Sequence, residues 1–294
     1  MKKKIREIKT DAGDFKYVSV IPVYSVPVAG SKRKVKFKPT SDAVEKINER
    51  NRQLYFEQLI HANADDLTLT LTLTYDDDFL PDGVEQIRKD IQNWIRRAGR
   101  LYKKNNAELK YIYVSQYGEE RGRPHHHVLI SGGVDEKELL KSWDMGIYSE
   151  VKKIEYNEKG AAGLAHYISR DMSADLDKPI IWRKRWSCSR NLKKNDISSR
   201  DGVFSQKDVK FIADNFAERD ILSVSARDRL EKRYAGYTLC GVDLHVSGYN
   251  GDKYIYLKFY KSDTPLLSEW RGQILKAKSK NKNRKTKERK NHAV

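Results

Sequence analysis

Residues 67–75 read Leu-Thr-Leu-Thr-Leu-Thr-Leu-Thr-Tyr, the most regular alternation of apolar and polar side chains in the sequence. A period of two places the leucines on one face of a β-strand and the threonines on the other. This stretch therefore predicts a half-buried strand, and the segments around it decide which elements share its sheet.

Helical and strand patterns alternate on both sides of this strand. Apolar residues from Val44 to Ile60 recur at helical spacing, and residues 84–102 predict an amphipathic helix. Residues 109–116 and 125–130 predict a β-hairpin. A short helix, an alternating strand and a further helix are expected over residues 136–143, 148–156 and 161–172. This order predicts an α+β fold, in which a central antiparallel sheet is flanked by helices.

Composition divides the chain into four parts. Residues 1–39 predict a basic, extended N-terminal arm with one or two strands, and residues 40–195 form the main domain. Residues 196–270 predict an extension with helices over 206–219 and 227–234 and a hairpin over 237–260. Residues 271–294 hold ten basic side chains and one acidic side chain, which predicts a disordered tail, either a phosphate-binding arm or a solubilising segment.

The chain is strongly basic, with 58 Lys and Arg against 41 Asp and Glu and a net charge of +17 over 294 residues. Such an excess indicates a polyanionic partner, either nucleic acid or an anionic membrane. Nucleic acid is favoured, because the longest apolar stretch, residues 17–30, is shorter than the about 20 residues that cross a bilayer. Cys188 and Cys240 lack the spacing of a zinc or redox site and indicate a reducing, cytoplasmic setting.

Three consecutive histidines stand on the second strand of the expected hairpin. Residues i and i+2 of a strand share a face, so His125 and His127 point together and His126 points away. Two imidazoles at this spacing can bind one divalent cation. A chance histidine run or a tag fragment is the alternative, but a position inside the chain on a strand favours a metal site.

The identity of a third ligand is left open by the spacing. Gln116 ends the neighbouring strand, while Glu119 and Glu120 lie in the connecting turn. Carboxylate oxygens suit Mg²⁺ or Mn²⁺, and these ions suit a phosphate substrate better than zinc does.

Three stretches, in this order, resemble the motifs of a known family. They are residues 71–76 (LTLTYD), 123–127 (RPHHH) and 166–170 (HYISR), and residues 184–194 resemble a segment that follows the third motif. Together they resemble the HUH endonucleases that initiate rolling-circle replication, among them the microvirus initiators and the gene II replication proteins of filamentous phages. The resemblance covers residues 40–195 and implies an RRM-like core.

The resemblance implies a transesterification. Tyr167 would attack a backbone phosphate, become linked to the 5′ end and release a 3′ hydroxyl that primes replication. A Mg²⁺ or Mn²⁺ ion held by His125, His127 and Gln116 would polarise the scissile phosphate. Arg170, about one helical turn from the tyrosine, is the second catalytic candidate.

Candidate nucleic-acid contacts surround these motifs. Arg123 precedes the histidines, and the segment after the expected tyrosine helix interleaves cations with tryptophans, which can stack on bases or pack within the protein. The candidates in that segment are Arg183, Lys184, Arg185, Trp186 and Arg190.

The sequence departs from the family's usual pattern at three positions. His126 replaces the apolar residue between the two histidines, Gln116 stands where many relatives have glutamate, and Arg170 stands where lysine is common. An amide oxygen is a weaker ligand than a carboxylate, and arginine donates a proton less readily than lysine.

The expected function is site-specific nicking and rejoining of single-stranded or origin DNA in the cytoplasm of a bacterial host. Host helicase and polymerase are the expected further partners, and no membrane is expected. A transposase or relaxase with the same chemistry is the alternative among enzymes, and a non-catalytic DNA-binding relative is the alternative from another class. The presence of both histidines and Tyr167 favours an enzyme.

Overall fold

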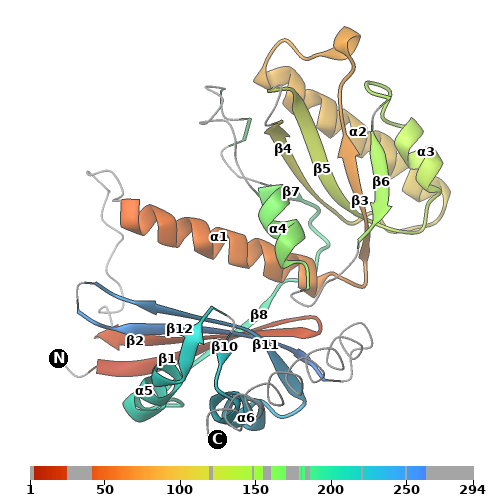
Figure 1. Ribbon diagram of the computed structural model, residues 1–294. Helices are drawn as coiled ribbons and strands as arrows, with labels where there is room; N and C mark the ends of the chain where they lie inside the picture. Colours follow the sequence, from red (N-terminus) through yellow and green to blue (C-terminus); the bar gives the residue numbers. More distant parts are fainter. Residues whose placement is uncertain are drawn as a thin grey trace, which may run out of the picture. The chain divides into compact units, whose positions relative to one another are not determined.

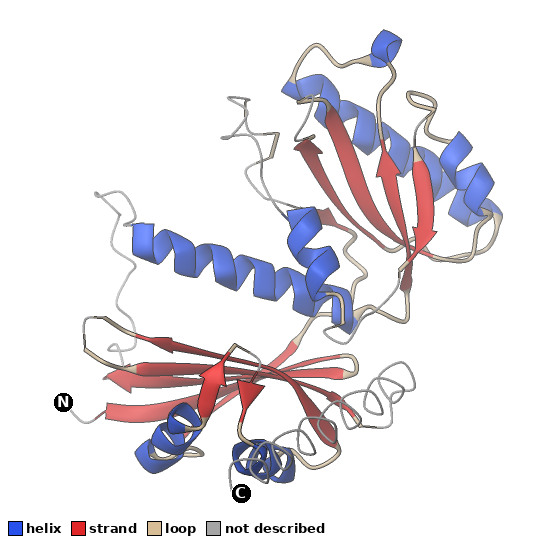
Figure 2. Ribbon diagram, in the orientation of Figure 1, coloured by secondary structure: helices blue, strands red, loops and turns tan. Residues whose placement is uncertain are grey.

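The computed structural model describes residues 3–24, 42–118, 122–147, 149–154, 160–169, 179, 181–182, 186–219, 221–248 and 250–262, and it gives only the backbone of residues 42–47, 162, 167 and 169. The chain divides into two compact units, each built on a five-stranded antiparallel sheet with flanking helices (Figures 1 and 2). The first unit comprises residues 1–37, 156–160 and 196–294, and the second comprises residues 38–155 and 161–195. The α+β class expected from the sequence is confirmed.

The second unit holds the sheet that carries the histidines. Its strands lie in the order β6-β3-β5-β4-β7, so the alternating Leu/Thr strand and the histidine strand are neighbours (Figure 1). The strands are β3 (Leu67–Leu73), β4 (Tyr111–Tyr117), β5 (Pro124–Ser131), β6 (Glu150–Lys153) and β7 (Ser187–Cys188). The expected hairpin is β4 and β5, paired in antiparallel register.

Helices α2 (Val84–Lys104) and α3 (Glu136–Lys141) cover one face of this sheet (Figure 2). The leucines of β3 point toward them, and Trp94 and Tyr102 of α2 are almost fully buried. Burying each such apolar surface stabilises the unit by about 2–3 kcal/mol. Their polar atoms are also satisfied, because Trp94 Nε1 donates to Ser142 Oγ at 2.8 Å and the Tyr102 hydroxyl donates to the Ser131 carbonyl.

Helices α1 (Asp42–Ala62) and α4 (Ala162–Ser169) complete the second unit and lie against each other (Figure 1). The end of α1 is held by Asn63, whose side chain donates to the Leu59 carbonyl at 2.9 Å. The polypeptide then turns, and β3 begins four residues later. Helix α4 contains position 167, on the helix where the sequence predicts the tyrosine.

The first unit joins both ends of the described sequence in one sheet, with the strand order β11-β12-β2-β1-β8. Its strands are β1 (Lys3–Ala12), β2 (Phe15–Tyr24), β8 (Asp196–Asp201), β11 (Tyr237–Val246) and β12 (Lys253–Lys261). Helices α5 (Gln206–Asp214) and α6 (Val224–Arg233) pack on its apolar face through residues such as Ile212 and Leu230. Strands β9 (Phe216–Glu218) and β10 (Ile221–Leu222) form a separate two-stranded sheet.

Three expectations for this unit need correction. Residues 3–24 are not an arm, because β2 pairs with β12 and β1 pairs with β8. The helix expected over 206–219 ends at Asp214, where Asn215 forms the C-cap and its side chain donates to the Phe211 carbonyl at 2.9 Å. Strand β8 was not expected, because its sequence is polar throughout, as an exposed edge strand permits.

The predicted tail, residues 271–294, lies outside the described residues. In the part of the chain that the structure describes, no helix is long and apolar enough to cross a membrane.

Candidate active site

His125 and His127 lie together on the face of β5 that points away from α2. Their Nε2 atoms are 3.1 Å apart, and their ring planes meet at 87°. Gln116, paired with His125 across β4 and β5, places its amide nitrogen 3.4 Å from His125 Nε2. The structure therefore brings together the three side chains that the sequence suggested as ligands.

The second ring nitrogen of each histidine faces a protein oxygen. His125 Nδ1 lies 3.5 Å from the Arg123 carbonyl oxygen, and His127 Nδ1 lies 3.4 Å from Thr72 Oγ1 on β3. A carbonyl only accepts, so the proton of His125 belongs on Nδ1 and its Nε2 carries a lone pair. A hydroxyl permits the same tautomer at His127. Sequence reasoning missed Thr72 as a partner, although it faces His127 directly in the strand register.

Both rings are neutral near pH 7. Burial, with a smaller effect of the neighbouring His125, lowers the pKa of His127 to about 3. Burial also lowers the pKa of His125, although its bond to the Arg123 carbonyl opposes the shift. Neutral imidazoles whose lone pairs converge are the form that binds metal ions.

The spacing of the ring nitrogens fits a shared cation. Adjacent ligands about 2.1 Å from an octahedral ion stand about 3.0 Å apart, close to the 3.1 Å between the two Nε2 atoms. No three His, Cys, Asp or Glu side chains gather to hold a metal ion within the described ranges. The Gln116 amide is therefore the third group offered there, after a half-turn that exchanges its nitrogen for its oxygen. Glu119 and Glu120 lie outside those ranges.

His126 points the other way, into the core beneath α2, and is fully buried. Its Nε2 lies 2.9 Å from the Tyr75 hydroxyl and its Nδ1 lies 2.8 Å from Ser115 Oγ. The chain of contacts continues from Tyr75 to the Asp90 carboxylate at 3.4 Å and from Ser115 to Trp182 Nε1 at 3.2 Å. Burial and the two flanking histidines lower the pKa of His126 to about 3. A neutral ring thus links three strands to α2 behind the histidine pair.

Arg123 lies next to β5 and is held by protein groups. Its guanidinium donates to the Asp77 carboxylate at 2.6 Å and to the Tyr75 carbonyl at 2.8 Å. Asp77 begins the short 3-10 helix η1 (Asp77–Phe79), and its side chain is 86% exposed. An exposed ion pair of this kind contributes only about 0–1 kcal/mol. A phosphate can therefore compete for Arg123 at small cost.

The catalytic candidates on the third motif are only partly described. Residue 167 lies on α4 in the same unit as the histidines, but its side chain is outside the described atoms. The distance from the Tyr167 hydroxyl to the histidine pair therefore stays a prediction. Four other candidates, Arg170, Arg183, Lys184 and Arg185, lie outside the described residues.

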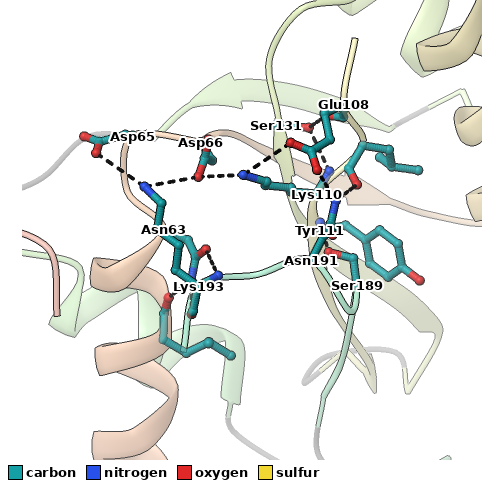
Figure 3. A network of polar contacts seen from close by, with 12 residues as sticks. Asn63, Asp65, Asp66, Glu108, Lys110, Tyr111, Ser131, Ser189, Asn191 and Lys193 are labelled. Carbon is teal, nitrogen blue, oxygen red and sulfur yellow. Dashed lines mark hydrogen bonds and ion pairs between the residues drawn. The ribbon is translucent and has the colours of Figure 1, made fainter. Parts of the chain in front are cut away.

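The segment that follows these residues returns along the edge of the sheet (Figure 3). Ser189 exchanges two hydrogen bonds with the backbone of Tyr111, and Asn191 donates to the Leu109 carbonyl at 3.2 Å. Asn63, at the end of α1, accepts from the Lys193 amide at 2.8 Å and donates to its carbonyl at 3.0 Å. This segment is therefore fixed to both α1 and β4.

The two described candidates in this segment differ in their surroundings. Trp186 packs against Phe56 and Tyr55 of α1, with ring centroids 4.7 Å and 6.3 Å away. Its packing role is thus visible, whereas stacking on a base stays a prediction. Arg190 is exposed and stays a candidate for nucleic-acid contact.

Comparison with known proteins identifies the class of this domain. Residues 68–175 match the family model of the replication-associated protein ORF2 and the phage gene II protein. The matched residues include all three stretches that carry the resemblance, and the match confirms the similarity to replication initiators of the rolling-circle type.

One curated relative adds detail. The chain is similar to the replication-associated protein ORF4 of Chlamydia phage 1, with 28% identity over 97 residues, which are 32% of this chain and 24% of the relative. The alignment thus spans about a quarter of the relative's length. No solved structure is significantly similar to the chain.

Proposed function

We propose that this chain initiates replication by nicking one strand of origin DNA with Tyr167 and a divalent metal ion. The observation that carries the proposal is the 3.1 Å approach of two neutral imidazole nitrogens on one strand face. The match to a replication-associated family supports the biological role, and the net charge of +17 suits a nucleic-acid substrate.

The side chains have distinct tasks in this reaction. His125, His127 and Gln116 would hold Mg²⁺ or Mn²⁺, which supplies Lewis-acid polarisation of the scissile phosphate when bound. Arg123 leaves Asp77 to contact a phosphate oxygen.

The covalent step exchanges one phosphodiester for another. The Tyr167 oxygen forms a bond to phosphorus and loses its proton to solvent, while the bond from phosphorus to the 3′ oxygen breaks and that oxygen takes up a proton. The products are a 5′-phosphotyrosine and a free 3′ hydroxyl, from which host helicase and polymerase extend the strand. Attack by a 3′ hydroxyl on the phosphotyrosine reverses the step and rejoins the DNA.

The nucleophile is tested with labelled single-stranded origin DNA and Mn²⁺, followed by a denaturing gel. Wild type should form a covalent adduct, and Tyr167→Phe should bind the DNA but form none. Tyr148→Phe and Tyr156→Phe are the matched controls and should form the adduct normally. An adduct that persists in Tyr167→Phe would refute the assignment, and DNA binding without any adduct in wild type would identify a non-catalytic relative.

The metal is tested by removing it and by removing a ligand. EDTA should abolish cleavage by wild type and added Mn²⁺ should restore it, whereas His127→Ala should stay inactive with a normal far-UV spectrum. Full activity in chelator would refute the metal site.

A further inference from the structure

Helix α4, which carries Tyr167, begins at a residue that cannot cap it. The first intrahelical bond runs from the Ala165 amide to the Ala161 carbonyl at 2.8 Å, so Ala161 occupies the N-cap position. An alanine side chain offers no acceptor to the unpaired amides of the first turn. Ala161 is also only 1% exposed, so its own amide needs a partner within the protein.

That partner comes from another helix. The Ala161 amide donates to Nε2 of His61 at 2.7 Å, and His61 lies in the last turn of α1 with 1% exposure. Figure 1 shows the end of α1 beside the start of α4. Because the donor is an amide, Nε2 of His61 carries a lone pair and the neutral ring is protonated on Nδ1. In a capping box, a side chain three residues further along the same helix accepts this bond.

The end of α1 is a firm support for this bond. Asn63 ties the chain just after α1 to both backbone groups of Lys193 and to the Leu59 carbonyl (Figure 3). His61 therefore connects the start of α4 to a helix end that is itself anchored. Residue 61 lies outside residues 68–175, so the family match does not include it.

We propose that His61 is a positioning residue for the nucleophile, because its bond to Ala161 sets where α4 begins and hence where Tyr167 stands. Each residue of an α-helix turns by about 100°, so a start shifted by one residue would redirect a side chain on the next turns. This inference rests on the proposed role of Tyr167. It requires no contact between His61 and DNA or metal.

Three variants of the full chain separate capping from general destabilisation. His61→Leu removes the acceptor, and His61→Gln keeps an acceptor of similar reach. Gln58→Leu is the matched control, because Gln58 is another buried polar residue of α1, bonded to Asn195 at 3.5 Å and not to α4. If His61→Leu does not fold, His61→Asn replaces it, because the shorter amide does not reach Ala161.

The first readout is amide hydrogen exchange without metal or DNA. Amides 161–165 should exchange roughly tenfold faster in His61→Leu, as expected for loss of a buried cap. His61→Gln should recover most of the protection, and Gln58→Leu should resemble wild type at these amides. Unchanged exchange in His61→Leu would overturn the capping role.

The second readout separates adduct formation from binding. His61→Leu should form the Tyr167 adduct about 10- to 100-fold more slowly, while its affinities for Mn²⁺ and origin DNA stay near those of wild type. His61→Gln should recover the rate. A normal rate despite faster exchange would overturn the positioning role. A wild type that forms no adduct would overturn the proposed function and the positioning role with it, and hydrogen exchange would still decide whether His61 caps α4.

Discussion

Replacing His126 with leucine removes the centre of the buried hydrogen-bond chain behind the histidine pair. The variant loses two hydrogen bonds, of 2.9 Å to Tyr75 and 2.8 Å to Ser115. Each lost bond to a buried group costs about 1–3 kcal/mol. Asp90 and Trp182 still contact the two hydroxyls, and leucine adds apolar surface. We therefore expect the free energy of unfolding at pH 7 to fall by about 2–3 kcal/mol.

The pH dependence of this difference is the sharper test. Because the pKa of His126 falls from 6.5 to about 3 on folding, the unfolded chain binds a proton in this range that the folded chain does not. Wild type therefore loses stability as the pH falls below about 6.5, by about 1.4 kcal/mol per pH unit for this histidine. Leucine binds no proton, so the gap between wild type and His126→Leu should narrow by that amount per unit between about pH 6 and pH 4.

Urea unfolding, followed by tryptophan fluorescence across this pH range, measures the gap. Four of the five tryptophans belong to the second unit, so the signal reports mainly on it: Trp94, Trp143, Trp182 and Trp186. The control is His245→Leu, at an exposed position of β11, which should leave the pH dependence as in wild type. A gap between wild type and His126→Leu that stays constant with pH would refute the buried, neutral state of His126.

Three further predictions test the packing, the returning segment and the tail. Gly146→Ala should lower the free energy of unfolding by about 1–3 kcal/mol, because a Cβ there would lie 2.1 Å from the Thr74 carbonyl oxygen. Gly99→Ala, whose Cβ meets only a side chain at 3.7 Å, should raise it by up to about 1 kcal/mol in urea unfolding; equal effects would contradict the close approach. Asn63→Ala should speed amide exchange at residues 189–193, whereas Asn191→Ala, with its exposed contacts, should do so less, and full protection in Asn63→Ala would show that the clamp is dispensable. Deleting residues 276–294 removes nine basic side chains and should flatten the salt dependence of DNA binding while short oligonucleotides are still nicked; an unchanged slope would show that the tail makes no phosphate contacts.

Local pattern was sufficient for most of the second unit. The alternation of residues 67–75 predicts β3, and the period-two rule alone predicts that His125 and His127 face one way and His126 the other. These features depend on neighbours within one strand, which the sequence displays directly. Pairing between distant strands leaves no such trace, so the sheet shared by β2 and β12 was missed.

The partners of the site residues were harder to predict than the residues themselves. Ser115 stands opposite His126 only because β4 and β5 pair in one particular register. The bond from His61 to Ala161 joins residues 100 positions apart and depends on how α1 packs against α4. No spacing rule encodes contacts of this kind, which arise only from tertiary packing.

The sheet of the first unit also has a consequence for synthesis on the ribosome. Strands β1 and β2 emerge first, yet the edge of β2 that pairs with β12 stays bare until residues 253–261 have been made. Every strand of the second unit is translated during this wait, so the histidine-bearing unit can fold while the first unit is incomplete. A nascent chain that stalls or is cut before β12 would expose the β2 edge, and an open strand edge invites pairing with another chain. The last described strand of the chain is thus the one that protects the first from aggregation.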